Sequence, residues 1–358
     1  MSLSAVAANY RATAAAAGVD VLAVVKADGY GHGVVPVARE LEEAGARGFG
    51  VALAEEAIEL RDAGVRGEIL ILNGVVGGAH AEVLHRDLIP VVYDLGEVEA
   101  FARAAQGRPF RVHLKVDTGM ARLGVSMKEL ASFLDALGTI KGATIDGLMT
   151  HLACADSDRA YTAMQLARFE SVIATVRAHG HVPRTLHAAN SAATFRHPEA
   201  RYHMVRPGIS LFGDAGFARG PSLRSCLRLR TEVVCLRKVE TGDRVGYDGA
   251  YVAPGPRTLA IVPLGYGDGL LRAVAQGGEV LVGGRRCPIV GRISMDLTHI
   301  DVSDLPRCEV GDEVVLLGAQ DGPFGEGEIT ARQLAAMAGT VPYEVLTNIS
   351  RRVPRCYA

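Results

Sequence analysis

The sequence lacks long apolar runs, concentrated positive charge and paired cysteines. No apolar stretch in its 358 residues approaches ~20 residues, which excludes a helical membrane span. The 38 basic and 40 acidic side chains nearly balance and form no basic stripe, so nucleic acid is not an expected partner. No basic segment precedes an apolar core at the start of the chain, so no secretory signal is predicted.

Cysteine usage also narrows the function classes. The six cysteines are scattered and none forms a C-x-x-C pair, which argues against a zinc or redox motif. Scattered cysteines without a signal peptide are typical of a reducing compartment. We therefore expect a cytoplasmic protein without a bound metal.

Lysine is scarce, and this scarcity makes each lysine informative. Only five of the 38 basic residues are lysines, so arginine supplies most of the positive charge. Arginine is always charged, whereas a lysine loses its charge readily when it is desolvated. A lysine beside an apolar strand is thus a candidate for lysine-specific chemistry.

What the chain does contain is a globular composition, 49% hydrophobic and 22% charged. In the first 210 residues, short β-branched runs alternate with Ala- and Leu-rich stretches of helical periodicity. Eight strands alternating with helices favour a closed (β/α)8 barrel of the TIM type over an open, doubly wound sheet. The predicted strands are 21–25, 49–52, 69–72, 89–92, 111–116, 145–150, 185–188 and 202–205, and clear helices are 34–44, 54–63, 95–106 and 161–178.

After Gly220 and Pro221 the pattern changes to short strands separated by Gly and Pro turns. One convincing helix, 331–338, ends at Gly339. We therefore predict an α/β protein whose barrel domain, residues 1–220, precedes a mostly-β domain, residues 221–358. Predicted strands of the second domain are 227–239, 258–264, 279–282, 289–293 and 313–317.

Reactive side chains follow several predicted barrel strands, where barrel active sites lie. Lys26 follows the first strand, and desolvation there would free its amine as a nucleophile able to form a Schiff base. The alternative is a lysine that caps the strand and pairs with Asp28. Likewise, Asn190–Ala193 and Arg206–Ser210 are candidate phosphate-binding loops, with ordinary turns as the alternative.

Ten residues from Val24 to Gly33 resemble the pyridoxal phosphate (PLP) attachment motif of alanine racemases. Further motifs of that family follow in order over nearly the whole chain. Each motif alone is weak, but the ordered set is highly specific. The motifs are HLKVDTGM at 113–120, RLG at 122–124, THLA at 150–153, ANSAA at 189–193, RPGI at 206–209, GYGDG at 265–269, GRISMD at 291–296 and PYEV at 342–345.

The resemblance implies a PLP-dependent head-to-tail homodimer that interconverts L- and D-alanine and supplies D-alanine for peptidoglycan. It implies that PLP is bound covalently to Lys26, and that Lys26 and Tyr247 are the two acid-base groups, Tyr247 reaching over from the partner subunit. Two groups on opposite faces of a planar carbanion are the simplest route to racemisation. The resemblance further implies cofactor contacts by Tyr30, His151, Ser191, Arg206, Gly208, Ile209 and Tyr343, substrate contacts by Arg122 and Met295, support by Lys115, His187 and Tyr266, and an entrance at Asp156, Tyr266 and Arg292.

Two points stay open within the resemblance. The family often carbamylates the lysine that Lys115 matches, which would make it an acceptor for Arg122, whereas the alternative is an unmodified Lys115 paired with Asp117. The family usually has one more strand upstream of Leu3, so a shortened start is expected.

Three rival functions remain: a broad-specificity racemase, a decarboxylase of the same fold type, and a non-catalytic PLP-binding protein. Residues 225–358 disfavour the last, because that family is a lone barrel. The sequence contains no Cys-Gly-Glu-Ser motif like that of the decarboxylases. The missing signal and the stretch 151–156 favour the alanine type over the broad-specificity enzymes, which are usually exported.

Overall fold

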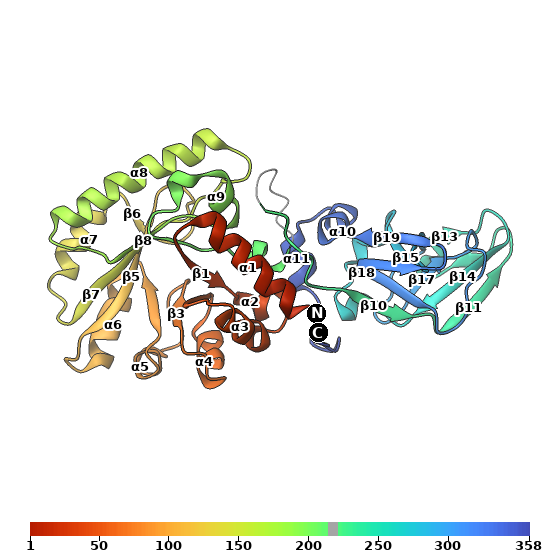
Figure 1. Cartoon of the computed structure of the whole chain (residues 1–358), viewed down its shortest axis with the longest axis horizontal. Helices are drawn as coiled ribbons and strands as arrows, with labels where there is room; N and C mark the ends of the chain where they lie inside the picture. The colour runs from red at the N-terminus through yellow and green to blue at the C-terminus, as the bar shows by residue number, and fades with distance from the viewer. Residues whose placement is uncertain (214–220) are drawn as a thin grey trace. The chain divides into compact units, whose positions relative to one another are not determined.

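The computed structural model describes residues 1–213 and 221–358. The chain divides into two compact units, one of Leu3–Arg224 and one of Ser225–Ala358 together with Met1–Ser2 (Figure 1). The predicted domain end at residue 220 lies outside the described residues, so that boundary stays a prediction. Among the described residues, no helix is both long and apolar enough to cross a membrane.

The first unit is a near-closed barrel of eight parallel strands, as predicted from the sequence. Adjacent strands pair in the order β8-β7-β5-β4-β3-β2-β1-β9, and the short β6 pairs beside β5. Each barrel strand lies within about two residues of its predicted range. The strands are β1 Asp20–Val24, β2 Gly48–Val51, β3 Glu68–Ile71, β4 Ile89–Val92, β5 Phe110–Asp117, β6 Val125–Ser126, β7 Ala143–Met149, β8 Thr185–His187 and β9 Met204–Val205.

The seam between β8 and β9 closes the barrel by isolated backbone bonds. The His203 amide donates to the Leu186 carbonyl at 3.1 Å, and the Arg206 amide donates to the Ala189 carbonyl at 2.8 Å. The neighbouring pairs β1–β9 and β7–β8 instead form parallel registers. The seam is therefore the least continuous part of the barrel wall among the described strands.

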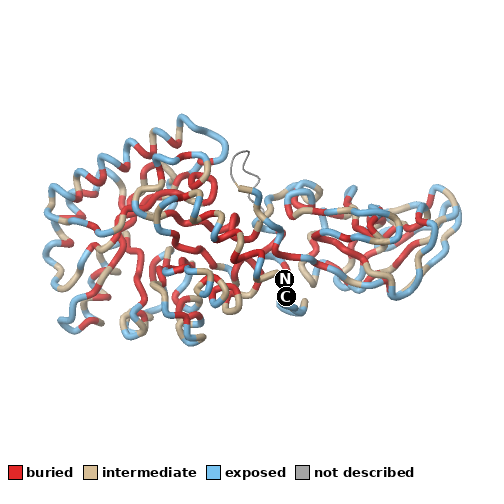
Figure 2. Tube along the Cα trace, in the orientation of Figure 1, coloured by how far each residue is buried: buried red, intermediate tan, exposed pale blue. Residues whose placement is uncertain are grey.

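Helices cover the outside of the strands, and Figure 2 shows buried strands inside a shell of partly exposed helices. In α3, Val34, Val37, Ala38 and Leu41 are buried, the i, i+3, i+4, i+7 spacing of one helix face. The helices of this unit are α1 Leu3–Ala17, α2 Lys26–Tyr30, α3 Val34–Glu43, α4 Ala54–Asp62, α5 His80–His85, α6 Leu95–Ala105, α7 Leu130–Leu137, α8 Arg159–Ala178 and α9 Ser191–Arg196, with 3₁₀ turns Pro198–Ala200 and Ile209–Phe212.

The second unit is an antiparallel sheet in the order β10-β18-β15-β16-β17-β14-β11, with β19 beside β18 and a separate β12–β13 ribbon. Helices α10 Ala331–Ala338 and α11 Pro342–Thr347 follow. The strands are β10 Leu229–Glu232, β11 Cys235–Val239, β12 Arg244–Val245, β13 Tyr251–Val252, β14 Arg257–Val262, β15 Glu279–Val282, β16 Arg285–Val290, β17 Thr298–Asp301, β18 Glu313–Gly322 and β19 Gly325–Ile329.

The single strand predicted over 227–239 is wrong, because the chain changes partners in its middle. The Val233 amide donates to Asp312, which leads into β18, whereas the Val234 amide donates to Ile261 of β14. Residues on the two sides of this point form β10, paired with β18, and β11, paired with β14. Residue composition does not reveal such a switch.

Candidate active site

Lys26 begins a tight left-handed turn directly after β1. Ala27, Asp28, Gly29 and Tyr30 all have φ between 54° and 62°, a conformation that costs non-glycine residues energy. Side chains stabilise this turn: Glu56 Oε1 accepts the Ala27 amide at 2.6 Å, and Asp28 Oδ1 accepts the Val34 amide at 2.8 Å. The turn fixes where Lys26 leaves the strand.

The environment of Lys26 favours its neutral form. Burial lowers the pKa of Lys26, the positive charge of Arg122 lowers it further, and Glu56 opposes the shift. Among the described residues no ion pair joins Lys26 to Asp28, whose carboxylate caps α3 instead. The strand-capping alternative therefore has no contact to support it, and the amine remains a candidate nucleophile or base.

Arg206 follows β9, the neighbour of β1, and its guanidinium is almost completely buried. It donates to the carbonyls of Thr150 (2.7 Å) and Ala188 (3.1 Å). It also donates to Nδ1 of His187 at 3.1 Å and to Nδ1 of His151 at 3.5 Å. Burial lowers the pKa of Arg206 to about 9, and burial together with Arg206 holds the pKa values of both histidines well below their usual range. Both imidazoles are thus neutral acceptors.

A cradle of backbone and hydroxyl groups forms beside this network. Ser191 Oγ accepts the amides of Gly208 (2.9 Å) and Ser210 (3.4 Å) and lies 3.2 Å from Ser210 Oγ. A Cβ on Gly208 would lie 2.2 Å from the Tyr30 hydroxyl oxygen, so any other residue there would displace the Tyr30 ring. The structure therefore brings Tyr30, Ser191, Gly208 and the adjacent Ile209 together, as expected for one binding loop.

Lys115, Arg122 and His151 line one narrow pocket at the ends of β5 and β7. Burial lowers the pKa of Lys115 to about 8, and Arg206, Arg122 and Lys26 contribute to this shift. Asp117 Oδ1 accepts the amides of Gly119 (2.8 Å) and Met120 (2.7 Å), and no ion pair with Lys115 occurs among the described residues. The basic side chains of Lys26, Lys115, Arg122 and Arg206 therefore lie near one another at this end of the barrel, which favours an anionic ligand there.

Tyr247, in the second unit, is 68% exposed and begins the short turn Tyr247–Gly249, which an ion pair stabilises. The next residue, Asp248, has a φ of 60°, and its carboxylate pairs with Arg292 at 2.6 Å. Gly246 and Gly291 both have positive φ, and a Cβ on Gly291 would lie 3.2 Å from the Val245 carbonyl oxygen, so glycine at 291 permits the two segments to lie side by side. An exposed tyrosine on a constrained turn is suited to act on a ligand that this unit does not itself enclose.

Tyr266 and Met295 are neighbours in the same unit. The Gly267 amide donates to the Met295 carbonyl at 2.9 Å, and a Cβ on Gly265 would lie 2.4 Å from the same oxygen. Tyr266, Met295 and Tyr343 are 41%, 53% and 46% exposed. Together with Tyr247 they form an exposed set of large side chains, which in soluble proteins often marks an interaction surface.

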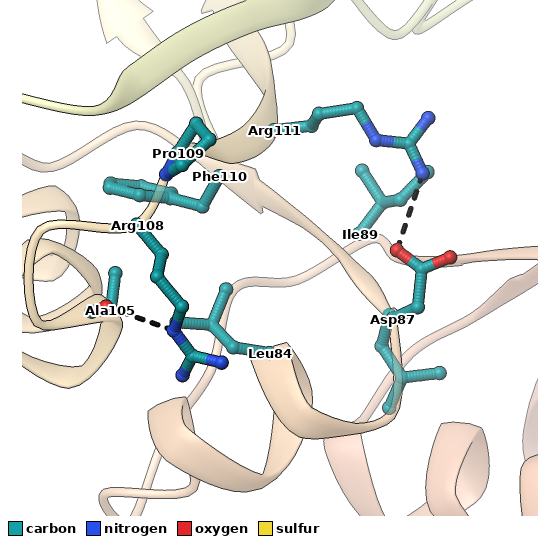
Figure 3. A pocket seen from close by; sticks show the side chains of 9 residues that line it. Leu84, Asp87, Ile89, Ala105, Arg108, Pro109, Phe110 and Arg111 are labelled. Carbon is teal, nitrogen blue, oxygen red and sulfur yellow. Dashed lines mark hydrogen bonds and ion pairs between the residues drawn. The ribbon is translucent and has the colours of Figure 1, made fainter.

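A further pocket of about 150 Å³ lies at the amino ends of β4 and β5, the barrel edge opposite the predicted site (Figure 3). Arg111 pairs with Asp87 at 3.5 Å, and Arg108 donates to the Ala105 carbonyl at 3.2 Å. Its lining, in the described part of the chain, includes none of the predicted site residues. We assign it no role.

The sequence analysis included His113 in a motif without giving it a role, and it did not single out Gly147. His113 Nδ1 lies 2.9 Å from His187 Nε2, which places it one step behind the Arg206 network. The available signal was its position two residues before Lys115, because alternate residues of a strand share a face. Gly147 gave no signal, because its role depends on a partner in another strand.

Comparison with known proteins identifies the family. The family model described as alanine racemase, N-terminal domain, matches residues 1–216, and that for the C-terminal domain matches residues 226–357. A relative named alanine racemase from Sorangium cellulosum is 48% identical over 93% of this chain and 90% of its own length. One from Geobacter sulfurreducens is 40% identical over 95% of this chain and 91% of its own length.

Solved structures agree with these sequence matches. Alanine racemase from Streptomyces coelicolor superimposes with a TM-score of 0.93 at 37% identity, covering 100% of this chain and 96% of its own. Alanine racemase from Bacillus anthracis, solved with bound L-Ala-P, gives 0.93 at 33% identity, covering 100% and 94%. The chain belongs to the alanine racemase family and is an amino-acid racemase that interconverts the enantiomers of alanine.

Proposed function

We propose that the chain racemises alanine in the cytoplasm with PLP bound covalently to Lys26, using Lys26 and Tyr247 as opposing acid-base groups. The product D-alanine would supply peptidoglycan synthesis. The observation that carries the proposal is the adjacency of β1 and β9. The Val24 amide donates to the Pro207 carbonyl at 2.9 Å, so the nucleophile candidate Lys26 and the buried cation Arg206 follow neighbouring strands.

Each chemical group of PLP can be matched with residues at this edge of the barrel. The partly buried amine of Lys26 suits covalent attachment, because burial favours its nucleophilic neutral form. The Gly208 space beside the Tyr30 hydroxyl and Ser191 suits a phosphate, with Ile209 and Tyr343 assigned to the same group. Arg206 is assigned to the pyridine nitrogen, and because a guanidinium has no acceptor, that nitrogen would stay unprotonated.

When bound, PLP supplies an electron sink that makes the Cα proton of an attached amino acid removable. Burial lowers the pKa of Lys26, which favours the neutral amine that removes this proton on one face; the protonated amine returns it. The phenol of Tyr247 does so on the other face. His151 accepts from Arg206 through Nδ1, so its Nε2 carries the proton and is free to stabilise a phenolate by donation.

Positively charged side chains and backbone groups are assigned to substrate and cofactor binding. Arg122 is assigned to the substrate carboxylate and the Met295 backbone to the cofactor ring oxygen. Lys115, whose pKa lies near 8, is neutral often enough to react with CO₂, and the resulting carbamate would accept from Arg122. His187 and Tyr266 support the site, His187 by accepting from Arg206.

We further propose a head-to-tail homodimer in which the partner subunit's Tyr247 completes each site. The exposure of Tyr247, Tyr266, Met295 and Tyr343 in one chain supports this arrangement. Mixing two inactive variants, Lys26→Ala and Tyr247→Phe, then refolding them together, should restore activity, since hybrid dimers contain one intact site. No activity above that of the separate variants would contradict a shared site.

Attachment of PLP is tested separately from turnover. Borohydride treatment of the PLP-loaded protein, followed by peptide mass spectrometry, should find the label on Lys26. Lys238, which is exposed on β11, provides the control: Lys238→Ala should retain the label and Lys26→Ala should lose it. Label on another lysine would contradict the proposal.

Turnover is tested by incubating the PLP-loaded protein with single L-amino acids in deuterated water, then separating the enantiomers with mass detection. D-alanine carrying one deuterium, with little product from other substrates, is expected. D-forms of many amino acids would instead indicate a broad-specificity racemase, and amines would indicate a decarboxylase. Loaded protein that forms no product would overturn the proposed function.

A further inference from the structure

Behind Arg206, a row of buried imidazoles runs down the inside of the barrel. Arg206 Nη1 lies 3.1 Å from His187 Nδ1, and His187 Nε2 lies 2.9 Å from His113 Nδ1. The two rings meet nearly edge to face, with centroids 5.0 Å apart and planes at 68°. His187 and His113 are 0% and 1% exposed. The row is therefore shielded from water throughout.

Hydrogen bonding from Arg206 determines which ring nitrogen carries the proton in His187 and in His113. A guanidinium only donates, so His187 Nδ1 must be the acceptor and its proton must be on Nε2. That N–H then faces His113 Nδ1, which must accept, so the His113 proton is on its own Nε2. Burial keeps both rings neutral, and it lowers the pKa of His113 to about 4. Arg206 on one side of His187 and His113 Nδ1 on the other therefore favour the same His187 tautomer, with the proton on Nε2.

The far end of the row is anchored in a charged cluster. His113 Nε2 lies 3.9 Å from Asp146 Oδ2, beyond hydrogen-bond distance, and makes no hydrogen bond within the described residues. Asp146 is itself held by Arg184 at 3.1 Å and lies 3.7 Å from Arg111. The carboxylate attracts the positive end of the His113 N–H dipole, which favours the same tautomer that Arg206 requires.

The strand geometry holds His113 in this place. His113 pairs with Gly147 in the β5–β7 register, directly after an irregularity between Val112 and His113. A Cβ on Gly147 would lie 2.3 Å from His113 Nδ1, so the ring occupies space that any other residue would fill. The acceptor atom is therefore fixed by the barrel wall.

We propose that His113 is a positioning residue for racemisation: by accepting from His187 Nε2 it locks the tautomer and orientation of His187, and through it the guanidinium of Arg206. This rests on the proposed function, in which Arg206 faces the PLP ring nitrogen. Without His113 the buried His187 N–H has no acceptor in this row, which favours a rotated ring or the other tautomer. Either change removes the acceptor that orients Arg206.

The first test uses the wild-type protein without cofactor. Histidine ¹⁵N NMR distinguishes protonated from unprotonated ring nitrogens. His187 and His113 should each show a single tautomer, protonated at Nε2, with a coupling across the Nε2–Nδ1 hydrogen bond. A His187 signal protonated at Nδ1, or an equal mixture, would overturn the proposal. This result does not depend on whether PLP binds, so it is separable from failure of the proposed function.

The second test compares His113→Leu with His113→Asn, whose amide oxygen can take the place of Nδ1. In His113→Leu the His187 signal should lose its single tautomer, the absorption band of bound PLP should shift, and kcat/KM should fall ~10-fold or more. His113→Asn should restore all three toward wild type. His197→Leu removes a buried histidine outside the row and should leave the His187 signal unchanged.

If His113→Leu does not fold, the wild-type spectrum and His113→Asn still decide the matter. A folded His113→Leu with an unaltered His187 tautomer, PLP band and kcat/KM would overturn the proposal. Equal losses in His113→Leu and His113→Asn would do so as well, because they would indicate a purely steric role.

Discussion

Gly147 in β7 makes room for His113 in β5: a Cβ at position 147 would lie 2.3 Å from His113 Nδ1. Glycine inside a strand weakens the strand because it packs no side chain. At this position the lost packing leaves space for a side chain of the neighbouring strand. Here it admits an imidazole whose only hydrogen bond among the described residues is to His187.

Gly147→Ala should therefore destabilise the protein by about 2–3 kcal/mol through overpacking, measured by urea unfolding. The cost should come from one contact, so it should largely vanish when Gly147→Ala is made in a His113→Ala background. Additive costs in the double variant would show that the clash lies elsewhere.

Gly208→Ala should abolish tight PLP binding, because the new Cβ would lie 2.2 Å from the Tyr30 hydroxyl oxygen. Absorbance titration with PLP should give a Kd raised ~100-fold or more, equivalent to about 3 kcal/mol. Gly255→Ala is the matched control and should bind normally, because a Cβ added at Gly255 would meet no atom within 4 Å. Equal affinity for the two variants would remove Gly208 from the phosphate site.

Lys115 should carry a carbamate when CO₂ is present. With a pKa of about 8, about a quarter of the amine is neutral at pH 7.5, against roughly one part in a thousand for an ordinary lysine. Native-state NMR with ¹³C-bicarbonate should show one carbamate signal that is lost in Lys115→Arg. A signal that persists in that variant, or none in the wild type, would support the unmodified lysine.

Buried histidines should make the protein less stable as pH falls. Burial lowers the pKa of His113 to about 4 and those of His151 and His187 well below 6.5, so the unfolded chain binds protons that the folded chain does not. Stability is thus present above about pH 6.5 and is lost toward pH 4, by about 1.4 kcal/mol per pH unit for each histidine. Urea unfolding at pH 7.5, 6 and 5 measures this slope. His113→Asn should reduce the slope of unfolding free energy against pH by the contribution of one histidine. An unchanged slope would contradict a lowered pKa for His113.

The Arg292–Asp248 pair should matter for turnover more than for folding. Both side chains are about half exposed or more, so the pair contributes about 1 kcal/mol or less to stability. Because it holds the turn that presents Tyr247, Arg292→Met should lower kcat/KM ~10-fold or more while urea unfolding changes little. Arg103→Met, which removes a comparable exposed pair with Glu99, should leave both unchanged. Unaltered turnover in Arg292→Met would mean that the turn holds its shape unaided.

The barrel strands and several helices were predictable because they depend on local patterns. β-branched runs mark β4 at its observed bounds, and the periodicity and Gly339 mark α10. The partner change at Val233–Val234 was not predictable, since it depends on which distant strand each amide reaches. Helix α1 was missed although its alanine-rich sequence favours a helix.

The candidate site divides in the same way. Ordered motifs marked Lys26, Arg206 and Ser191 as candidate site residues, and all three lie at one edge of the barrel. The row behind Arg206 depends on the register of β5 against β7, where a single irregularity before His113 decides which residue it faces. A one-residue change of register would turn the ring to the other side of the sheet.

The β8–β9 seam is where we expect the barrel wall to open most readily in local fluctuations. His187 and Arg206 lie at the part of the barrel that is joined by isolated bonds, while the neighbouring pairs β7–β8 and β1–β9 form parallel registers. Local fluctuations begin where few backbone bonds must break together, so amide exchange should be fastest across this seam. A ligand bound by Arg206 and the Gly208 loop would hold the two sides of the seam together and reduce this local opening. Ligand binding should therefore slow hydrogen exchange at the Arg206 amide.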